Sequence, residues 1–388
     1  MNYSSPTSLH IPVGINFECT GCGNCCFSWP VPLNDNDVSR LETLAALEAR
    51  DYIKPLGQRS DALKSSTHSL EKRADGKCVF LDDDNRCKLH SNFGPEAKPA
   101  MCQLFPYTFT PTPSGVYASV SFASTGVLTN SGRPLQEQSE HLQSRWSLMQ
   151  SLNPEYQPDW HSAQLLDGVP ISWTEYLAVD RDLLELLRPN GPHVSILSLC
   201  EQACSLLMSR LPAAYPLDRN FTETPPEVMD RILISYLLDF YFPDDVFEST
   251  ESNLPARMML QHMVSPAAAS LRIIPNQLLS EVDPQIDQLL RRFLYCRVFS
   301  KLYFGPGYNF LSVTAGLHHL CCLVALVRIA LKSAIGTTSG DTFTAAAELV
   351  RKLERRLTMA RFSRETVSVL EVLFTSPSRV KRILALGA

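Results

Sequence analysis

Cysteine thiols are crowded into one short stretch near the start of the chain, CTGCGNCC. Its four cysteines are Cys19, Cys22, Cys25 and Cys26, so two C-x2-C steps end in a pair of adjacent thiols. A C-x2-C loop can curl its backbone so that two thiolates point at one ion, and the glycines between the cysteines make that curl easier. The spacing predicts either a soft-metal site or a disulfide staple.

Three further cysteines follow within the first part of the chain. Cys78 and Cys87 bracket a predicted β-hairpin in KCVFLDDDNRCKLH, and Cys102 lies in KPAMCQLFP. If residues 82–85 form the turn, Phe80 faces Cys87, and Cys78 and Cys87 become diagonal neighbours on one face, ~7 Å apart. A turn of odd length would undo this arrangement. The acidic DDDN stretch is interpreted as a turn, since it lacks the spaced oxygen ligands of a calcium loop.

The length and the N-terminus of the chain favour the metal site over the disulfide staple. A chain of 388 residues can bury a large core, so it needs no disulfides to stay folded. The N-terminal sequence has no basic start followed by a long apolar core, so we expect no signal peptide. These features predict a cytoplasmic protein, where glutathione keeps ordinary thiols reduced. We therefore favour metal binding over redox-active disulfides and over inert structural cysteines.

Hydropathy and charge restrict the partners. The apolar stretch from Leu311 to Leu331 is long enough to cross a membrane, but His318, His319 and Arg328 interrupt it. Because ionisable groups are costly in hydrocarbon, we interpret this stretch as a buried core helix and expect no membrane partner. The net charge of −5 and the pI near 6.0 lack the basic excess typical of a nucleic-acid binder, so we expect no nucleic-acid partner.

The number of thiols bears on the identity of the metal. Structural zinc takes four ligands, and seven cysteines do not divide neatly into tetrahedra. A C-x2-C-x2-C run is similar to the start of a ferredoxin-type ligand set, although the adjacent fourth cysteine and the missing C-x3-C-P depart from it. We therefore favour an iron–sulfur cluster over zinc as the cofactor. Lys77, Lys88 and Lys98 lie nearby in the sequence, where they either offset thiolate charge or stay solvated.

The sequence divides into two regions, which together predict an α+β fold. Residues 1–130 are loop-rich, with strands predicted in GINFEC and GVYASVSFAS and a helix for which Asn34 or Asp35 is the N-cap. Residues 131–388 carry apolar residues at three- and four-residue intervals, which is typical of helices. We predict a small cysteine-rich α+β metal-binding domain followed by a larger all-α domain. The predicted helices are Pro134–Leu152, Thr174–Leu187, Val194–Leu211, Glu227–Phe242, Pro284–Phe304, Asn309–Ala334, Thr342–Leu357 and Arg364–Phe374.

Other chemistry-bearing residues lie within the predicted helices. His318, His319, Cys321 and Cys322 share one apolar helix, where a metal site is geometrically possible because His318 and Cys322 are one turn apart. We interpret them as core positions, because free cysteine packs as a small apolar residue and a buried histidine can hydrogen-bond to a neighbour. The same interpretation covers the remaining cysteines, Cys200, Cys204 and Cys296.

A run of basic and aromatic residues lies in one of the later predicted helices. Its members are Arg291, Arg292, Tyr295, Arg297, Lys301 and Tyr303. We interpret the run as a solvated helix face, because long basic side chains keep their charged ends in water. The alternative is a binding face for an acidic partner or for a substrate carboxylate.

The cysteine-containing segments resemble the CxxCxxCC family of zinc- or iron-chelating proteins, also called YkgJ-type cysteine cluster proteins. The matching pieces are FECTGCGNCC, VPLNDNDVSRL, CVFLDDDNRCKLH and KPAMCQLFPYTF, which together cover roughly residues 15–110. The resemblance implies that the metal ligands are Cys19, Cys22, Cys25, Cys26, Cys78, Cys87 and Cys102.

The layout of the whole chain is similar to that of flagellin lysine-N-methylase, in which a long helical region follows the cysteine domain. The stretch RRFLYCRVFSKLYFGPGYNF, residues 291–310, resembles that family's C-terminal region in its aromatic and basic texture. This resemblance implies S-adenosylmethionine as the methyl donor and a protein lysine as the acceptor. No glycine-rich strand–loop–helix signature for a nucleotide stands out. Three functions stay open: a protein lysine methylase, a non-enzymatic metal-binding module whose helical half docks a partner protein, and a thiol redox sensor.

Overall fold

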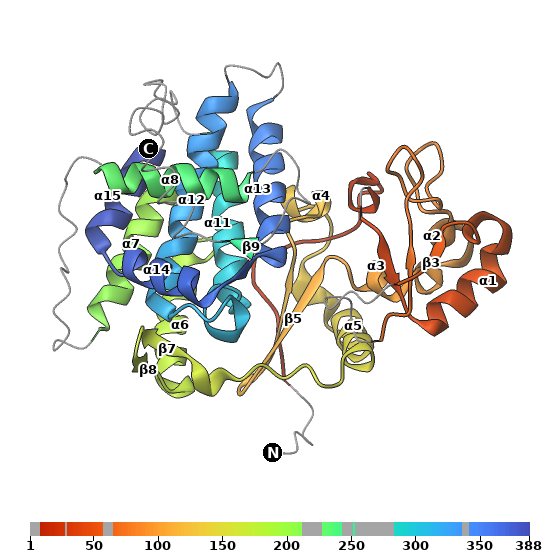
Figure 1. Ribbon diagram of the computed structural model, residues 1–388, viewed down its shortest axis with the longest axis horizontal. Helices are drawn as coiled ribbons and strands as arrows, with labels where there is room; N and C mark the ends of the chain where they lie inside the picture. Colours follow the sequence, from red (N-terminus) through yellow and green to blue (C-terminus); the bar gives the residue numbers. More distant parts are fainter. Residues whose placement is uncertain are drawn as a thin grey trace. The chain divides into compact units, whose positions relative to one another are not determined.

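The chain forms two compact units in a computed structural model, Met1–Gln157 and Pro158–Ala388, and each is described here by itself (Figure 1). The structure describes residues 8–27, 29–56, 65–211, 227–242, 251–252, 283–335 and 341–388. The first unit carries two small sheets and short helices, and the second is built almost entirely of helices. The predicted α+β fold with a helical second part is confirmed.

The longest strands of the first unit form a hairpin. Strands β5 (Tyr107–Thr112) and β6 (Gly115–Val120) pair antiparallel, and β1 (Leu9–His10) adds in parallel to β6. The predicted strand in GVYASVSFAS is therefore confirmed. The predicted strand in GINFEC does not form. This segment contributes one isolated bridge, between Asn16 and Pro134, and its Phe17 N–H donates to the Arg133 carbonyl at 3.1 Å.

A second sheet supports the longest helix of this unit. Strands β2 (Val31–Leu33), β4 (His68–Leu70) and β3 (Ile53–Pro55) form an antiparallel sheet in that order. Helix α1 (Asp35–Ala49) packs on it and begins at Asn34, whose side chain accepts from the Asp37 N–H at 2.8 Å in a capping box. The prediction of an N-cap at Asn34 or Asp35 is confirmed, with Asn34 in that role.

The predicted hairpin between Cys78 and Cys87 is wrong. Leu81, not Phe80, faces Cys87, so the loop between them has five residues, and the Asp82 carboxylate accepts from the Arg86 N–H at 2.8 Å. The odd loop length shifts the register by one residue, which moves side chains to the opposite face. After Cys87 the chain enters helix α2 (Lys88–Phe93) and forms no second strand.

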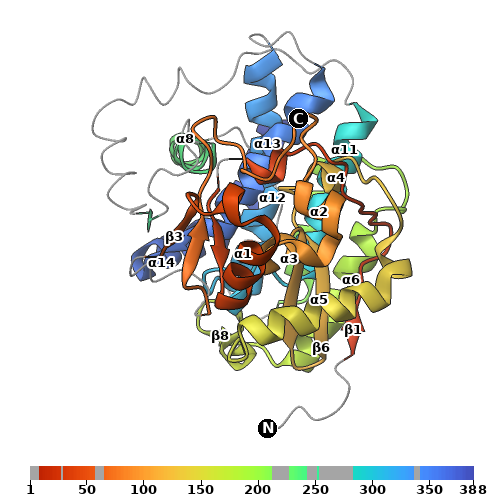
Figure 2. The same cartoon turned by 90° about the vertical axis from the view of Figure 1, so that its right-hand side faces the viewer.

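The first unit extends beyond the predicted boundary at residue 130. Helix α5 (Ser139–Leu152), which the sequence pattern assigns to the helical region, packs on α3 (Ala100–Leu104) and β5 (Figure 2). The Arg145 guanidinium donates to Gln103 Oε1 at 2.6 Å, and the Trp146 ring lies 5.7 Å from that of Phe109. Because helical periodicity does not reveal what a helix packs against, the division after Gln157 was not visible in the sequence. The other short elements of this unit are η1 (Asn24–Cys26), η2 (Pro95–Ala97), α4 (Thr125–Leu128) and η3 (Leu135–Gln138).

The second unit is organised around one long apolar helix, α12 (Val313–Ile335). Helices α7 (Ile196–Ser209), α13 (Thr342–Met359), α14 (Arg364–Phe374) and α15 (Pro377–Gly387) pack around it, and α8 (Val228–Tyr241) lies across it (Figure 1). By length and composition Val313–Lys332 could cross a membrane, but 94% of this stretch is buried, as expected of a core helix. The other elements described in this unit are η4 (Trp160–Ser162), β7 (Gln164–Leu166), β8 (Val169–Pro170), α6 (Trp173–Leu187), β9 (Glu251–Ser252), α11 (Pro284–Phe299), η5 (Gly305–Gly307) and β10 (Arg361–Phe362).

All eight predicted helices are present, and some of their ends differ for backbone reasons. Helix α11 ends at Phe299 rather than Phe304, because Lys301 adopts a left-handed conformation with φ 60°. Helix α12 begins at Val313, since Asn309 and Phe310 also have positive φ. Helix α15 was not predicted.

Candidate metal centre

The CTGCGNCC loop packs against the turn that links Cys78 to Cys87. Gly23 has φ 71° and precedes the 3-10 turn η1, and a methyl group built on it would lie 2.9 Å from Cβ of Asn85. Glycine is therefore required at this position for two reasons, the left-handed backbone and the close approach. The contact places the cysteine loop directly beside the second cysteine segment.

Backbone pairing brings Cys26 next to Cys78. The Cys78 N–H donates to the Cys26 carbonyl at 3.1 Å, and Phe27 forms an isolated bridge with Lys77. The Sγ atoms of Cys25 and Cys26 lie 3.8 Å apart. With metal–sulfur bonds of ~2.3 Å, two ligands of a tetrahedral ion lie ~3.8 Å apart. This pair of adjacent thiols therefore already has the separation that a shared ion requires.

Four thiols are close enough to one another to perturb their acidity. A hydrogen bond with Cys25, and then burial, raise the pKa of the Cys26 thiol. Burial is the main cause of the raised pKa values of Cys78, Cys87 and Cys102, and the neighbouring Cys26 raises each of them further. The fold thus brings together thiols from four segments in a buried place, where the negative charge of a thiolate is costly unless a positive charge lies nearby.

A buried ammonium lies beside these thiols. Lys72 forms an isolated bridge with Cys78, and its Nζ is buried with no hydrogen-bond partner among the residues that the structure describes. Its charge opposes the upward pKa shifts of Cys26, Cys78 and Cys102, and that of Lys98 does the same for Cys26 and Cys102. An anionic thiolate group would provide the partner that the Lys72 ammonium lacks.

The sequence did not indicate Lys72 as the lysine beside the thiols, and it suggested Lys77, Lys88 and Lys98 instead. Of those, Lys98 acts on the thiols, whereas the Lys77 ammonium donates to Asn85 Oδ1 at 3.0 Å. The register that pairs Lys72 with Cys78 depends on the local turn at residues 73–76, where the Gly76 N–H donates to the Arg73 carbonyl at 2.8 Å. The Asp75-Gly76 pair in that turn is a typical turn signal, and it could have indicated the register.

The other two predicted ligands have different surroundings. The Cys22 thiol lies 3.2 Å from Oγ1 of Thr125 at the start of α4, within hydrogen-bond distance. Cys19 is exposed and close to Tyr107, whose pKa is raised to about 12, mainly by burial. Five of the seven predicted ligands, Cys25, Cys26, Cys78, Cys87 and Cys102, therefore form one group, which we call the N-terminal thiol group.

The donor set of the N-terminal thiol group fits a thiophilic metal. Within the described parts of the chain, no three His, Cys, Asp or Glu side chains are already arranged to hold an ion, so binding requires side-chain rotation. The chemistry nevertheless matches, because the thiols are the ligands that zinc and iron–sulfur clusters take. The unpartnered ammonium of Lys72 supplies the opposite charge.

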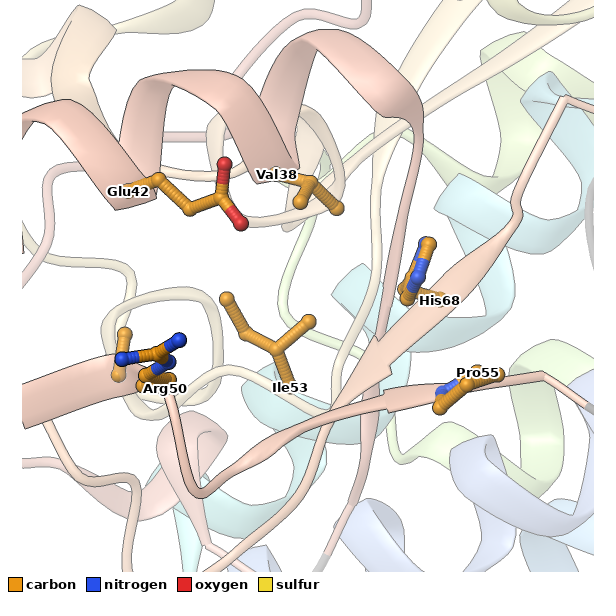
Figure 3. Close-up of a pocket in the computed structure, with 7 residues that line it drawn as sticks. Val38, Glu42, Arg50, Ile53, Pro55 and His68 are labelled. Carbon is orange, nitrogen blue, oxygen red and sulfur yellow. The ribbon is translucent and has the colours of Figure 1, made fainter. Parts of the chain in front are cut away.

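The same unit contains a surface pocket that the thiols do not line. It lies between α1 and the strands β3 and β4, and has a volume of about 280 Å³ (Figure 3). Glu42 and Arg50 line it with opposite charges, together with the imidazole of His68. No cysteine lines it, so it adds nothing to the ligand set. Its other lining residues are Val38, Ala49, Ile53 and Pro55.

In the second unit, the predicted core cysteines and histidines are buried. His319 Nε2 lies 3.0 Å from the Tyr241 hydroxyl. The interpretation of the basic run as a solvated face is wrong, because Arg291 and Lys301 are 5% and 0% exposed. Arg291 donates to backbone carbonyls such as that of Pro192 at 2.7 Å, and the Lys301 ammonium to both oxygens of Asp180 at 2.8 and 2.7 Å.

The N-terminal thiol group and the two small sheets belong to one cysteine-rich unit. Residues 18–127, less than a third of the chain, match the family described as "Putative zinc- or iron-chelating domain", CxxCxxCC. Uncharacterized protein MJ0939 of Methanocaldococcus jannaschii is 32% identical over 97 residues, which are 24% of this chain and 30% of that protein. The chain thus spans less than a third of that relative. No solved structure matches the chain.

Proposed function

We propose that the first unit binds an iron–sulfur cluster through the thiolates of the N-terminal thiol group, with zinc as the alternative metal. The observation that supports this most directly is the buried Lys72 ammonium, which has no hydrogen-bond partner among the described residues and lies close to three of the thiols. Burial of a charge is costly unless an opposite charge accompanies it. Metal-bound thiolates at this position would supply that charge.

Seven cysteines favour the cluster over a single zinc ion. Five thiols already gather in the group, one more than a tetrahedral zinc site uses. Cys19 and Cys22 stay predicted ligands, because they belong to the same loop as Cys25 and Cys26. Gly21 and Gly23 lie between those cysteines with positive φ, a backbone conformation that glycine adopts easily and that curls the loop.

The residues of the chain have separate tasks at this centre. A bound iron–sulfur cluster supplies one-electron chemistry, and bound zinc supplies a structural crosslink or a Lewis acid. Lys72 and Lys98 stabilise the negative charge of the thiolates. Backbone pairing of Cys26 with Cys78 holds two ligand segments together before metal arrives, and burial of Cys78 excludes water.

X-ray absorption at the iron edge tests the proposal on the full chain, reconstituted anaerobically with iron and sulfide. We expect a sulfur shell at ~2.3 Å. The shell should be lost when Cys26→Ser and Cys78→Ser are combined, and retained in Cys296→Ala, which removes an equally buried thiol from α11. A shell of oxygen and nitrogen alone, or an unchanged shell in the double variant, would refute the ligand assignment.

For the protein as a whole we propose a cytoplasmic protein lysine methylase that uses S-adenosylmethionine. Its support is the similarity of the chain layout to flagellin lysine-N-methylase, with the helical unit supplying the surface for the protein substrate. The alternatives are a non-enzymatic module that docks a partner protein and a thiol redox sensor. Calorimetric titration of the metal-loaded full chain with S-adenosylmethionine tests the methylase proposal. Heat of binding supports the methylase, and its absence eliminates it.

A further inference from the structure

A second group of cysteines lies in the core of the second unit, between α7 and α12. Cys200 and Cys204 are one turn apart on α7, and Cys321 lies on α12, which packs against α7. The Cys321 thiol is close enough to both of the others to raise the pKa of each, and its Sγ lies 3.9 Å from the Cys200 carbonyl oxygen, to which it can donate. All three side chains are fully buried.

His318 adds a nitrogen donor to this group. It precedes Cys321 by three residues, so the two side chains lie on the same face of α12. Its Nδ1 is 2.5 Å from the Phe374 carbonyl of α14. Because a carbonyl only accepts, Nδ1 carries the hydrogen, and the lone pair of the neutral ring is on Nε2. His318 is close enough to Cys321 to affect the acidity of its thiol.

The Nε2 atom of His318 is one of several buried side-chain polar atoms that have no hydrogen bond within the described part of the chain. It is buried and has no hydrogen-bond partner among the residues that the structure describes, although the side chain is 0% exposed. Buried polar atoms in proteins nearly always have partners, so this lone pair requires an explanation. Histidines that bind metals commonly donate their other ring N–H to a backbone carbonyl, as His318 does.

We propose that Cys200, Cys204, Cys321 and His318 form a second metal site, which binds zinc with three thiolates and one imidazole. Three cysteines and one histidine are an established ligand set for structural zinc, and two facing helices with ligands one turn apart can supply it. Binding replaces three S–H protons, which leave to solvent, and Nε2 donates its lone pair without releasing a proton. The site is independent of the function proposed above for the first unit.

The four donor atoms do not yet surround one point, as no preformed ligand group occurs among the described residues. The three thiols are nevertheless buried together where α7 packs on α12, and Cys200 and Cys204 are one helical turn apart. Zinc binding therefore requires rotation of these side chains toward a common centre. Cys322 also neighbours Cys321, Cys200 and Cys204, but the proposed ligand set does not need it, because three thiolates and one imidazole complete a tetrahedron.

Cobalt titration of the full chain tests this site, because tetrahedral cobalt–thiolate centres absorb in the visible range. The titration uses a background variant with Cys26→Ser and Cys78→Ser, which removes two proposed ligands of the metal site in the first unit. The result for the second site then does not depend on whether the first unit binds metal. We expect this background to bind one equivalent of cobalt, which zinc displaces. Adding Cys204→Ala should weaken binding at least ~100-fold, since it removes a direct ligand. Adding Cys296→Ala, a matched loss of one buried thiol, should leave binding unchanged.

His318→Gln provides the second variant, in case Cys204→Ala impairs folding. We expect it to retain the helical circular dichroism of the background and to weaken cobalt binding at least ~10-fold. Release of about three protons per zinc, measured with a pH indicator, should accompany binding in the background alone. Absence of cobalt binding in the background, or equal binding in the background and in His318→Gln, would overturn the proposal.

Discussion

Replacement of Lys72 by methionine is predicted to change the metal-free and the metal-bound protein in opposite directions. In the metal-free protein the Lys72 ammonium is buried with no hydrogen-bond partner in the described part of the chain. A buried polar group without a partner costs about 1–3 kcal/mol. Lys72→Met removes this cost and retains an unbranched apolar chain. We therefore expect the free energy of unfolding of the metal-free protein to rise, by about 1 kcal/mol.

The metal-bound protein loses a favourable charge interaction in the same variant. Two opposite unit charges ~5–8 Å apart attract by about 2–3 kcal/mol at an effective dielectric constant of ~20. Lys72 is half-buried as a residue, so solvent screening reduces this by roughly half. The remaining 1–1.5 kcal/mol, an order-of-magnitude figure, corresponds to a metal affinity that is roughly tenfold weaker.

Competition with a chromophoric chelator measures that affinity, and urea unfolding measures the stability of the metal-free form. Lys77→Met is the matched control, because the Lys77 ammonium donates to Asn85 and not to the thiols. We expect less than a twofold change of metal affinity in the control, a minimal effect typical of surface charges. Unchanged affinity in Lys72→Met, or an equal loss in both variants, would refute the charge-compensation argument.

Three further predictions concern the two units separately. Cys78→Ser should release the metal and speed proteolysis of the first unit while the second unit resists as before, because metal binding and folding are coupled; equal cleavage of both units would contradict this. Asp180→Asn should lower the free energy of unfolding in urea by about 3–5 kcal/mol, since it leaves the buried Lys301 ammonium without its carboxylate. A loss below about 1 kcal/mol would show that the pair is not buried in solution. Burial lowers the pKa of His319 from 6.5 to about 3, so its contribution to stability is complete above pH 6.5 and is lost as the pH falls towards 3, by up to about 1.4 kcal/mol per unit. His319→Gln should flatten the stability profile in that range, and an identical profile would disprove the assignment.

The helices of the second unit were predictable because each one carries its own apolar face. Periodicity alone identified α6, α7, α8, α11, α12, α13 and α14, and the start of α1 followed from the capping residue Asn34. Their ends depend on backbone conformations such as the positive φ of Lys301, which residue type does not indicate. Charge on a helix proved a poor guide to exposure, since Arg291 is buried and satisfied by carbonyl groups.

The spacing of the cysteines and the family resemblance predicted the five cysteines that gather in the candidate site together with Cys19 and Cys22, which lie in other surroundings, and they did not predict its internal arrangement. The five-residue loop closed by Asp82 and Arg86 sets which residue faces Cys87, and a sequence pattern of period two does not specify loop length. Lys72 reaches the thiols only through its bridge with Cys78. The second thiol group requires the packing of α7 on α12, a long-range contact without a local signal.

The measurement that tests the central claim most directly is iron, zinc and acid-labile sulfide analysis of the anaerobically purified full chain, beside a variant that combines Cys26→Ser, Cys78→Ser and Cys102→Ser. We expect the unsubstituted protein to contain iron with matching sulfide and broad absorbance near ~400 nm, or stoichiometric zinc, and the variant to lose at least one equivalent of metal. An unsubstituted protein that contains neither metal and takes up none on reconstitution, or a variant that retains all of its metal, would contradict the account.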